Sequence, residues 1–153
     1  MGMSNTLPSE VAAVVATIDP DVYTAASTTL SDAIDMSKVD QILAVVMSGT
    51  LGSSATLAAK LTQATTSGGT YKDITGKAIT TLSQAVSPDN SDDQALINCR
   101  ADELDIDNDY RWVKLSVTVA VATSDAGAVV FGFGERYGPA FDGDLASVIE
   151  IVN

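Results

Sequence analysis

Residues 110–123 constrain the fold of this chain more than any other stretch. The residues of one parity are almost all aliphatic: Arg111, Val113, Leu115, Val117, Val119 and Val121. The residues of the other parity are mixed: Tyr110, Trp112, Lys114, Ser116, Thr118 and Ala120. Successive side chains of a strand point to opposite faces, whereas a helix would scatter these β-branched residues, which are stiff in helices. The pattern predicts a long strand in the centre of an antiparallel sheet.

Two further strands are predicted before it. Residues 39–48 are apolar on both parities, which fits a strand covered on both sides, and residues 55–64 alternate between apolar and polar side chains. The Gly-rich residues 49–54 separate them. A short loop between two strand patterns is typical of a hairpin, so we expect these two strands to pair with each other.

The remaining strand patterns are shorter. Residues 10–18 fit either a helix capped by Ser9 or a strand, and we favour the strand because β-branched residues abound and Pro20 follows closely. A second turn is predicted at residues 65–70, and Gly76 breaks the strand pattern that follows it. Gly132 and Gly134 suggest close backbone approach or a bend. A turn is expected at residues 124–127. The other expected strands span residues 71–74, 77–83, 95–100, 128–134 and 145–152.

Together these patterns predict an all-β fold, an antiparallel β-sandwich of about seven to nine short strands. A chain of 153 residues ordinarily forms one domain. We assign residues 36–153 to the sandwich. Residues 1–35 lack a self-contained apolar pattern, and we expect an extended N-terminal arm or edge strand that contacts a neighbouring subunit.

The charge of the chain excludes some partners. Twenty acidic residues against eight basic ones give a formal net charge of −12. Such a chain repels phosphates, so we expect no direct binding of nucleic acid. No apolar run reaches the roughly 18 residues that span a bilayer, and no signal peptide pattern is present. We therefore expect a protein without a membrane partner.

The sequence offers little catalytic chemistry. It has no histidine and a single cysteine, Cys99. Histidine is the commonest general base, and a lone cysteine most often packs as a small buried hydrophobe. No serine lies in a nucleophile motif with an evident base, and no phosphate-binding loop appears. We expect neither enzymatic activity nor a cofactor.

One acidic cluster has the beginning of a metal-binding pattern. Asp105, Asp107 and Asp109 occupy alternate positions, as at the start of a calcium loop. The later positions do not fit, because Tyr110 replaces the required glycine and Ser116 replaces the bidentate glutamate. We expect a solvated acidic loop and no bound metal.

The interface candidates are Trp112, Arg111, Lys114 and Tyr23. Trp112 lies on the outward parity of the central strand, where it either packs under a loop or anchors an interface, a role that tryptophan favours. Arg111 and Lys114, with Lys60, either bind acidic groups of a partner or pair with nearby carboxylates, and local pairs contribute little stability. Tyr23 belongs to the expected arm.

Three motifs carry a resemblance to a known class of proteins. They are Gly-Thr-Leu-Gly at residues 49–52, Lys-Asp-Ile-x-Gly at residues 72–76 and Arg-x-Val-x-Leu at residues 111–115, in that order along strand patterns covering residues 35–140. This arrangement resembles small structural proteins encoded among the head and tail genes of tailed bacteriophages.

The resemblance implies a virion structural protein. Its leading form is a capsid decoration (cement) protein, made in the host cytoplasm, that binds the major capsid protein or other virion proteins on the capsid surface and bridges capsid subunits, often as a homo-oligomer and preferably a trimer. A tail or head–tail connector component is one alternative, and a carbohydrate-binding β-sandwich module of a fibre is another.

Overall fold

The computed structural model describes residues 7–136 and 143–152, and in that part of the chain the predicted all-β sandwich is confirmed. The strands are β1 (Ala13–Tyr23), β2 (Ser27–Leu30), β3 (Ile34–Asp35), β4 (Gln41–Ser48), β5 (Thr56–Ala64), β6 (Lys72–Ala78), β7 (Leu82–Ser83), β8 (Gln94–Arg100), β9 (Trp112–Ala120) and β10 (Ser124–Phe133). The helical turns are α1 (Pro8–Val11), η1 (Ala101–Glu103), η2 (Ile106–Asn108) and η4 (Leu145–Ser147).

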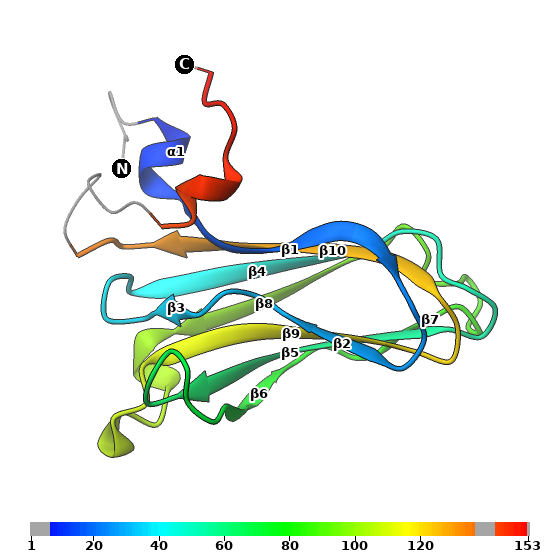
Figure 1. Cartoon of the computed structure of the whole chain (residues 1–153), viewed down its shortest axis with the longest axis horizontal. Coiled ribbons are helices and arrows are strands. Elements are labelled where there is room, and N and C mark those ends of the chain that lie inside the picture. Colours follow the sequence, from blue (N-terminus) through cyan, green and yellow to red (C-terminus); the bar gives the residue numbers. More distant parts are fainter. Residues whose placement is uncertain (1–6, 137–142, 153) are drawn as a thin grey trace.

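The strands form two antiparallel sheets that pack face to face (Figure 1). We call them sheet A, with the order β1-β10-β4-β8, and sheet B, with the order β2-β9-β5-β6. Two short strands extend sheet B, because β3 pairs with β9 and β7 pairs with β5. Strands that follow each other in the chain mostly lie in different sheets, so the chain passes repeatedly between the two layers.

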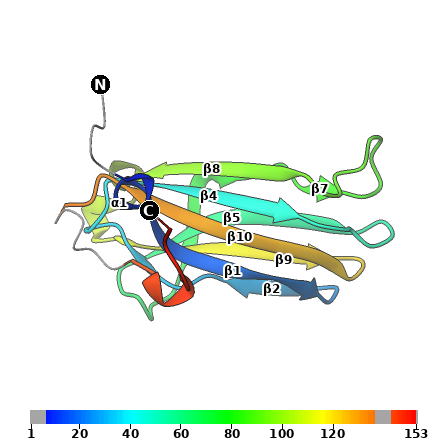
Figure 2. The same ribbon diagram turned by 90° about the horizontal axis from the view of Figure 1, so that it is seen from above.

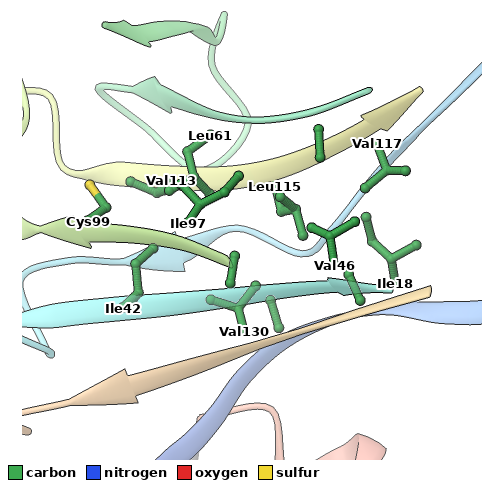
Figure 3. Close-up of a cluster of buried hydrophobic side chains, with 14 of the residues drawn as sticks. Ile18, Ile42, Val46, Leu61, Ile97, Cys99, Val113, Leu115, Val117 and Val130 are labelled. Atoms are coloured by element: carbon green, nitrogen blue, oxygen red, sulfur yellow. The ribbon is translucent and has the colours of Figure 1, made fainter. Parts of the chain in front are cut away.

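The core forms between the two layers (Figure 3). Strand β9 lies between β2 and β5, as the alternation of residues 110–123 predicts, and Val113, Leu115, Val117 and Val119 are each at most 3% exposed. The facing side chains of sheet A are equally buried: Ile42, Ala44, Val46, Ile97, Ala128 and Val130. Valine, isoleucine, leucine and alanine therefore fill most of the interior.

The hairpin predicted for residues 39–48 and 55–64 is wrong. Strand β4 pairs with β10 and β8 in sheet A, and β5 pairs with β9, β6 and β7 in sheet B. The connection between them crosses from one layer to the other beside the corner that leads from β9 to β10. Gly52 permits this contact, because a Cβ there would lie 2.4 Å from the carbonyl oxygen of Thr123. A hairpin and a crossing corner both need small residues, so the local pattern did not distinguish them.

The turn predicted at residues 124–127 lies earlier in the chain. Val121 adopts a φ of 73°, and β10 already begins at Ser124. The hydroxyl of Ser124 accepts a hydrogen bond from the N–H of Gly52 and donates one to the carbonyl of Ala122. Ser124 is a small polar residue that joins the β4–β5 and β9–β10 connections by hydrogen bonds. Serine is also common in turns, so the sequence pattern predicted a turn there.

Two other segments also differ from the prediction. Residues 145–152 do not form a strand: η4 is followed by residues without a sheet partner in the described part of the chain. Strand β6 continues through Gly76, whose φ of 76° accompanies a register shift between β6 and β5, where a break was predicted. Close backbone approach was one prediction for Gly132, but the neighbours there are side chains: a Cβ would lie 2.7 Å from Cγ1 of Val15.

The described part of the predicted arm forms edge strands of the same chain. Strand β1 is one edge of sheet A and pairs with β10, and β2 is one edge of sheet B and pairs with β9. Within residues 10–18 the chain changes from α1 to β1 at Ala12. Residues 13–35 thus contribute backbone to both layers of the sandwich.

Candidate functional site

Aromatic and basic side chains gather on the outer face of sheet B and at the adjoining end of the sandwich, where β5 ends and β9 begins. These strand ends lie at the left of Figure 1. We call this cluster the aromatic–basic patch. Its members are Lys60, Tyr71, Lys72, Tyr110, Arg111, Trp112 and Lys114. It holds four of the eight basic residues of an otherwise acidic chain.

The strand register places Lys60, Trp112 and Lys114 on the outer face of sheet B, whereas Lys72, which is opposite the buried Gln63, and Arg111 lie at the adjoining end of the sandwich. Trp112 is opposite Ala64, and Lys114 is opposite Thr62, which in turn is opposite Asp73. Partners across antiparallel strands project from the same face. Because the alternate residues of β9 fill the core, Trp112 and Lys114 point outward, and the residues just before β9 and β6 complete the patch.

Each aromatic ring of the patch has a cation beside it. The Nζ of Lys72 lies 3.9 Å from the centre of the Tyr110 ring, and the Nζ of Lys114 lies 4.9 Å from that of Tyr71. The Cζ of Arg111 lies 5.3 Å from the ring centre of Trp112. Cations at such distances are attracted to the face of the ring, so the cations and rings hold one another in place before any partner binds.

Carboxylates at the border of the patch pair with most of its cations. Lys60 pairs with Asp73 at 2.8 Å, and Arg111 pairs with Asp35 at 3.2 Å. These are the local pairs that the sequence analysis weighed against partner contacts. Lys114 forms no ion pair with any described residue, and its ammonium group is the one in the patch most available to a carboxylate of a partner.

The ion pair between Lys72 and Asp105 affects both groups. Its hydrogen bond raises the pKa of Lys72. The same bond, together with a hydrogen bond from the side chain of Asn108, lowers the pKa of Asp105. Both groups are therefore charged at neutral pH, and the pair ties the start of β6 to the loop before β9.

Two shallow grooves border the patch. One, of about 420 Å³, is lined by polar side chains that include Lys72, Asp73 and Glu103. The other, of about 310 Å³, runs beside Tyr110 and Arg111. Side chains of a bound protein have room to enter on either side of the patch.

The structure brings together three of the four predicted interface residues, Trp112, Arg111 and Lys114. Tyr23 lies in sheet A at the far end of β1, where its hydroxyl donates to the carbonyl of Asp19 and its ring packs against the core. Burial, followed by the charges of Asp21 and Asp19, raises the pKa of Tyr23. Tyr23 is therefore separate from the patch.

Sequence reasoning missed Tyr71, Lys72 and Tyr110. Their signal was present, because Tyr71-Lys72 and Tyr110-Arg111 are adjacent aromatic–basic pairs. These pairs are far apart in the chain, and only the pairing of β5 with both β6 and β9 places them side by side.

In the acidic loop, one of the three aspartates of the calcium-like pattern is already hydrogen-bonded within the protein. The carboxylate of Asp105 accepts from Lys72 and Asn108, while Asp107 and Asp109 are exposed. Asp109 ends η2 in the left-handed conformation, with a φ of 61°. No group of three side chains able to hold a metal ion occurs among the residues that the structure describes.

The single thiol is buried. Cys99 belongs to the core, and burial raises its pKa to about 11. The thiol is therefore protonated at neutral pH, which disfavours a nucleophilic role. Among the described helices, none is long and apolar enough to span a membrane.

Comparisons with known proteins assign no family. No family model matches the chain, and no curated protein matches it. A solved structure of infectious bursal disease virus, Gt strain, aligns with a TM-score of 0.42 and 15% sequence identity, over 82% of this chain and 33% of that one. This chain spans about a third of the length of that viral chain. A likeness at this level assigns no function.

Proposed function

We propose that this chain is a non-enzymatic structural protein of a virus particle that binds other virion proteins through the aromatic–basic patch. In its specific form, the proposal is a capsid decoration protein that bridges subunits of the shell. The observation that carries the binding role is the patch itself, and the proposal of a virion setting comes from the resemblance of residues 35–140 to phage structural proteins.

The composition of the patch favours a protein partner. Tryptophan, tyrosine and arginine are the residues most enriched among those that dominate binding energy. Here they occur together on a rigid sheet, and their cation–ring contacts lower the cost of ordering the side chains on binding. Because Lys114 has no carboxylate partner among the described residues, the complementary surface presents a carboxylate or a carbonyl oxygen to it.

The chemistry of the described residues supports a role without catalysis. The one thiol is buried and protonated, and the sequence contains no histidine. Lys72 of β6 forms an ion pair with Asp105 of the acidic loop. These groups serve to fix the position of loops, and none is poised as a nucleophile with a base.

The proposal is tested by binding of the purified chain to shells assembled from the major capsid protein of the same virus, measured by co-sedimentation. We expect Trp112→Ala to weaken binding roughly 30-fold, as for a central anchor, and Lys114→Gln to weaken it about tenfold through the loss of one charged contact. Gln41→Glu is the control: it shifts the net charge by the same amount as Lys114→Gln but lies exposed on sheet A.

Equal binding by all four proteins, with unchanged melting temperatures, would exclude the patch as the contact. Binding only to portal or tail assemblies would support the connector alternative instead. A glycan array tests the fibre alternative: specific sugar binding that depends on Trp112 or Tyr71 would contradict the proposal. One face of each ring already contacts a cation, so we expect no such binding.

A further inference from the structure

Residues 148–152, Val-Ile-Glu-Ile-Val, form an apolar segment that leaves the sandwich after η4 (Figure 1). Ile149 is fully exposed, and Val152 is 84% exposed. Val148 has extended backbone angles, with φ −102° and ψ 109°. Residues 149–152 make no backbone hydrogen bond to any described residue. The segment thus has the composition of a strand and an extended first residue, but no sheet partner among the described residues.

Strand β8 is a sheet edge that lacks the usual protection. Sheet edges are commonly protected by proline, bulges or charges. The opposite edge of sheet A, β1, contains Pro20 and two register shifts. In contrast, β8 pairs with β4 through seven consecutive residues without a shift and contains no proline. It borders the sheet in Figure 2, with Leu96 59% exposed.

The segment and the edge complement each other. The outward side chains of β8 are Gln94, Leu96, Asn98 and Arg100, and Arg100 is its only charged residue. In the segment, Glu150 is the only charged residue, and it shares its parity with Val148 and Val152. An antiparallel strand with that parity facing outward and Val152 opposite Leu96 would place Glu150 opposite Asn98, diagonally next to Arg100. Such pairs across strands are favourable.

The segment cannot reach the β8 edge of its own molecule. Asp144 is fixed beside β1, because its N–H donates to the carbonyl of Val14. The position beyond β8 is four strand spacings away, about 19 Å. The four residues from Asp144 to Val148 span at most about 14 Å when fully extended. The partner of the segment must therefore be another molecule, and a second copy of this chain supplies the matching edge.

We propose that residues 148–152 of one copy add as a strand to the β8 edge of a second copy. The contact is head-to-tail, because each copy donates its segment at one place and accepts a segment at another. Contacts of this kind build closed rings or open filaments. The proposal does not depend on a virion partner, since both halves of the contact belong to this chain.

Charge reversal tests the contact by sedimentation velocity of the whole chain over a dilution series. We expect Glu150→Lys and Arg100→Glu each to weaken self-association at least about tenfold. An equimolar mixture of the two variants should regain association, because the lysine of one variant meets the glutamate of the other. Two weakened variants that stay weak when mixed would overturn this pairing.

A second pair of variants distinguishes this specific contact from non-specific hydrophobic association. The double change Ile149→Asp and Ile151→Asp alters exposed side chains only, and it should abolish association without changing the melting temperature. Val86→Asp, at an exposed aliphatic residue far from the segment in sequence, is the control and should have no effect. A wild-type chain that remains monomeric across the series, or association equally reduced by Val86→Asp, would overturn the proposal.

Discussion

At the residue scale, a few small polar side chains satisfy buried backbone groups that the aliphatic core cannot hydrogen-bond. Ser31 is buried in the segment between β2 and β3, where the regular pairing with β9 is interrupted. Its hydroxyl accepts the N–H of Leu115 at 3.0 Å and donates to the carbonyl of Asp32. Without that hydroxyl the N–H of Leu115 would be buried without a partner, which is costly.

We therefore expect Ser31→Ala to lower the free energy of unfolding by about 1–3 kcal/mol. Ser27→Ala, at a half-buried edge residue whose hydroxyl donates to the carbonyl of Thr24 in a solvent-exposed hydrogen bond, should lower it by only a few tenths. Urea unfolding of the two variants beside the wild type measures the difference. Equal stability of both variants would show that the buried N–H finds another acceptor.

Substitutions at two glycines test the contact between the β4–β5 and β9–β10 connections, with Gly52 as the test position and Gly68 as the control. A Cβ at Gly52 would lie 2.4 Å from a backbone oxygen, whereas a Cβ at Gly68 would meet nothing within 4 Å. Gly52→Ala should destabilise the fold by about 1–3 kcal/mol through overpacking. Gly68→Ala should be neutral or slightly stabilising, because it only restricts the unfolded chain. Melting curves test this, and a neutral Gly52→Ala would show that the two corners do not touch.

At the element scale, the strands were easier to predict than their partners. The alternation of β9 indicated both its central position and its buried face, because burial of one face requires that pattern. The apolar strands β4 and β5 were also predicted as strands, but their partners were not predicted correctly. Pairing depends on contacts between residues far apart in the chain, and no local periodicity records them.

Glu103 links two elements through a titratable group. Its carboxylate accepts the N–H of Arg100 at 2.8 Å and pairs with Lys77 at 2.9 Å, so it joins η1 to β6. The backbone hydrogen bond first, and then the contact with Lys77, lowers the pKa of Glu103 below its ordinary value of 4.5. A lowered pKa means that folding favours the ionised form.

This stabilisation is complete above pH 4.5, the ordinary value, and is lost as the pH falls through the lower pKa of the folded state. We expect the melting temperature of the wild type to fall across that acidic range more steeply than that of Glu103→Gln. Scanning calorimetry between neutral and acidic pH measures both slopes. Parallel curves would show that this carboxylate does not link folding to pH.

At the scale of the whole molecule, residues 13–35 contribute to both layers. Strand β1 completes one edge of sheet A, while β2 and β3 cover one side of β9. Their removal would take the buried Ile18 and Ile34 out of the core and expose Leu115 to water. We expect deletion of residues 1–35 to abolish cooperative unfolding in circular dichroism. A folded product would show that these residues form a separable arm, as the sequence analysis considered.

The net charge of −12 gives the two proposed contacts opposite responses to salt. Copies of one acidic chain repel each other at long range, and salt screens that repulsion. Added salt should therefore strengthen self-association. It should weaken binding through the aromatic–basic patch where a carboxylate of the partner meets Lys114, because salt screens that attraction. Sedimentation of the chain, alone and with its shell partner, across a salt series measures both, and a common direction would contradict the assignment of the two surfaces.

The candidate site was only half visible in the sequence. Arg111, Trp112 and Lys114 lie together on one strand, and alternation alone placed Trp112 and Lys114 outward. Tyr71 and Lys72 join them through the antiparallel pairing of β5 with β6, which is a long-range contact. The unpartnered segment at residues 148–152 was predicted as a strand of the same domain, because its propensity is that of a strand whether or not the chain provides a sheet for it.

Electron microscopy of purified particles tests the central claim most directly. The account predicts density for the two-layer sandwich on the outside of the shell, with the aromatic–basic patch of sheet B facing a capsid subunit. Absence of the protein from purified particles, or density in which sheet B faces solvent and makes no contact, would contradict the account.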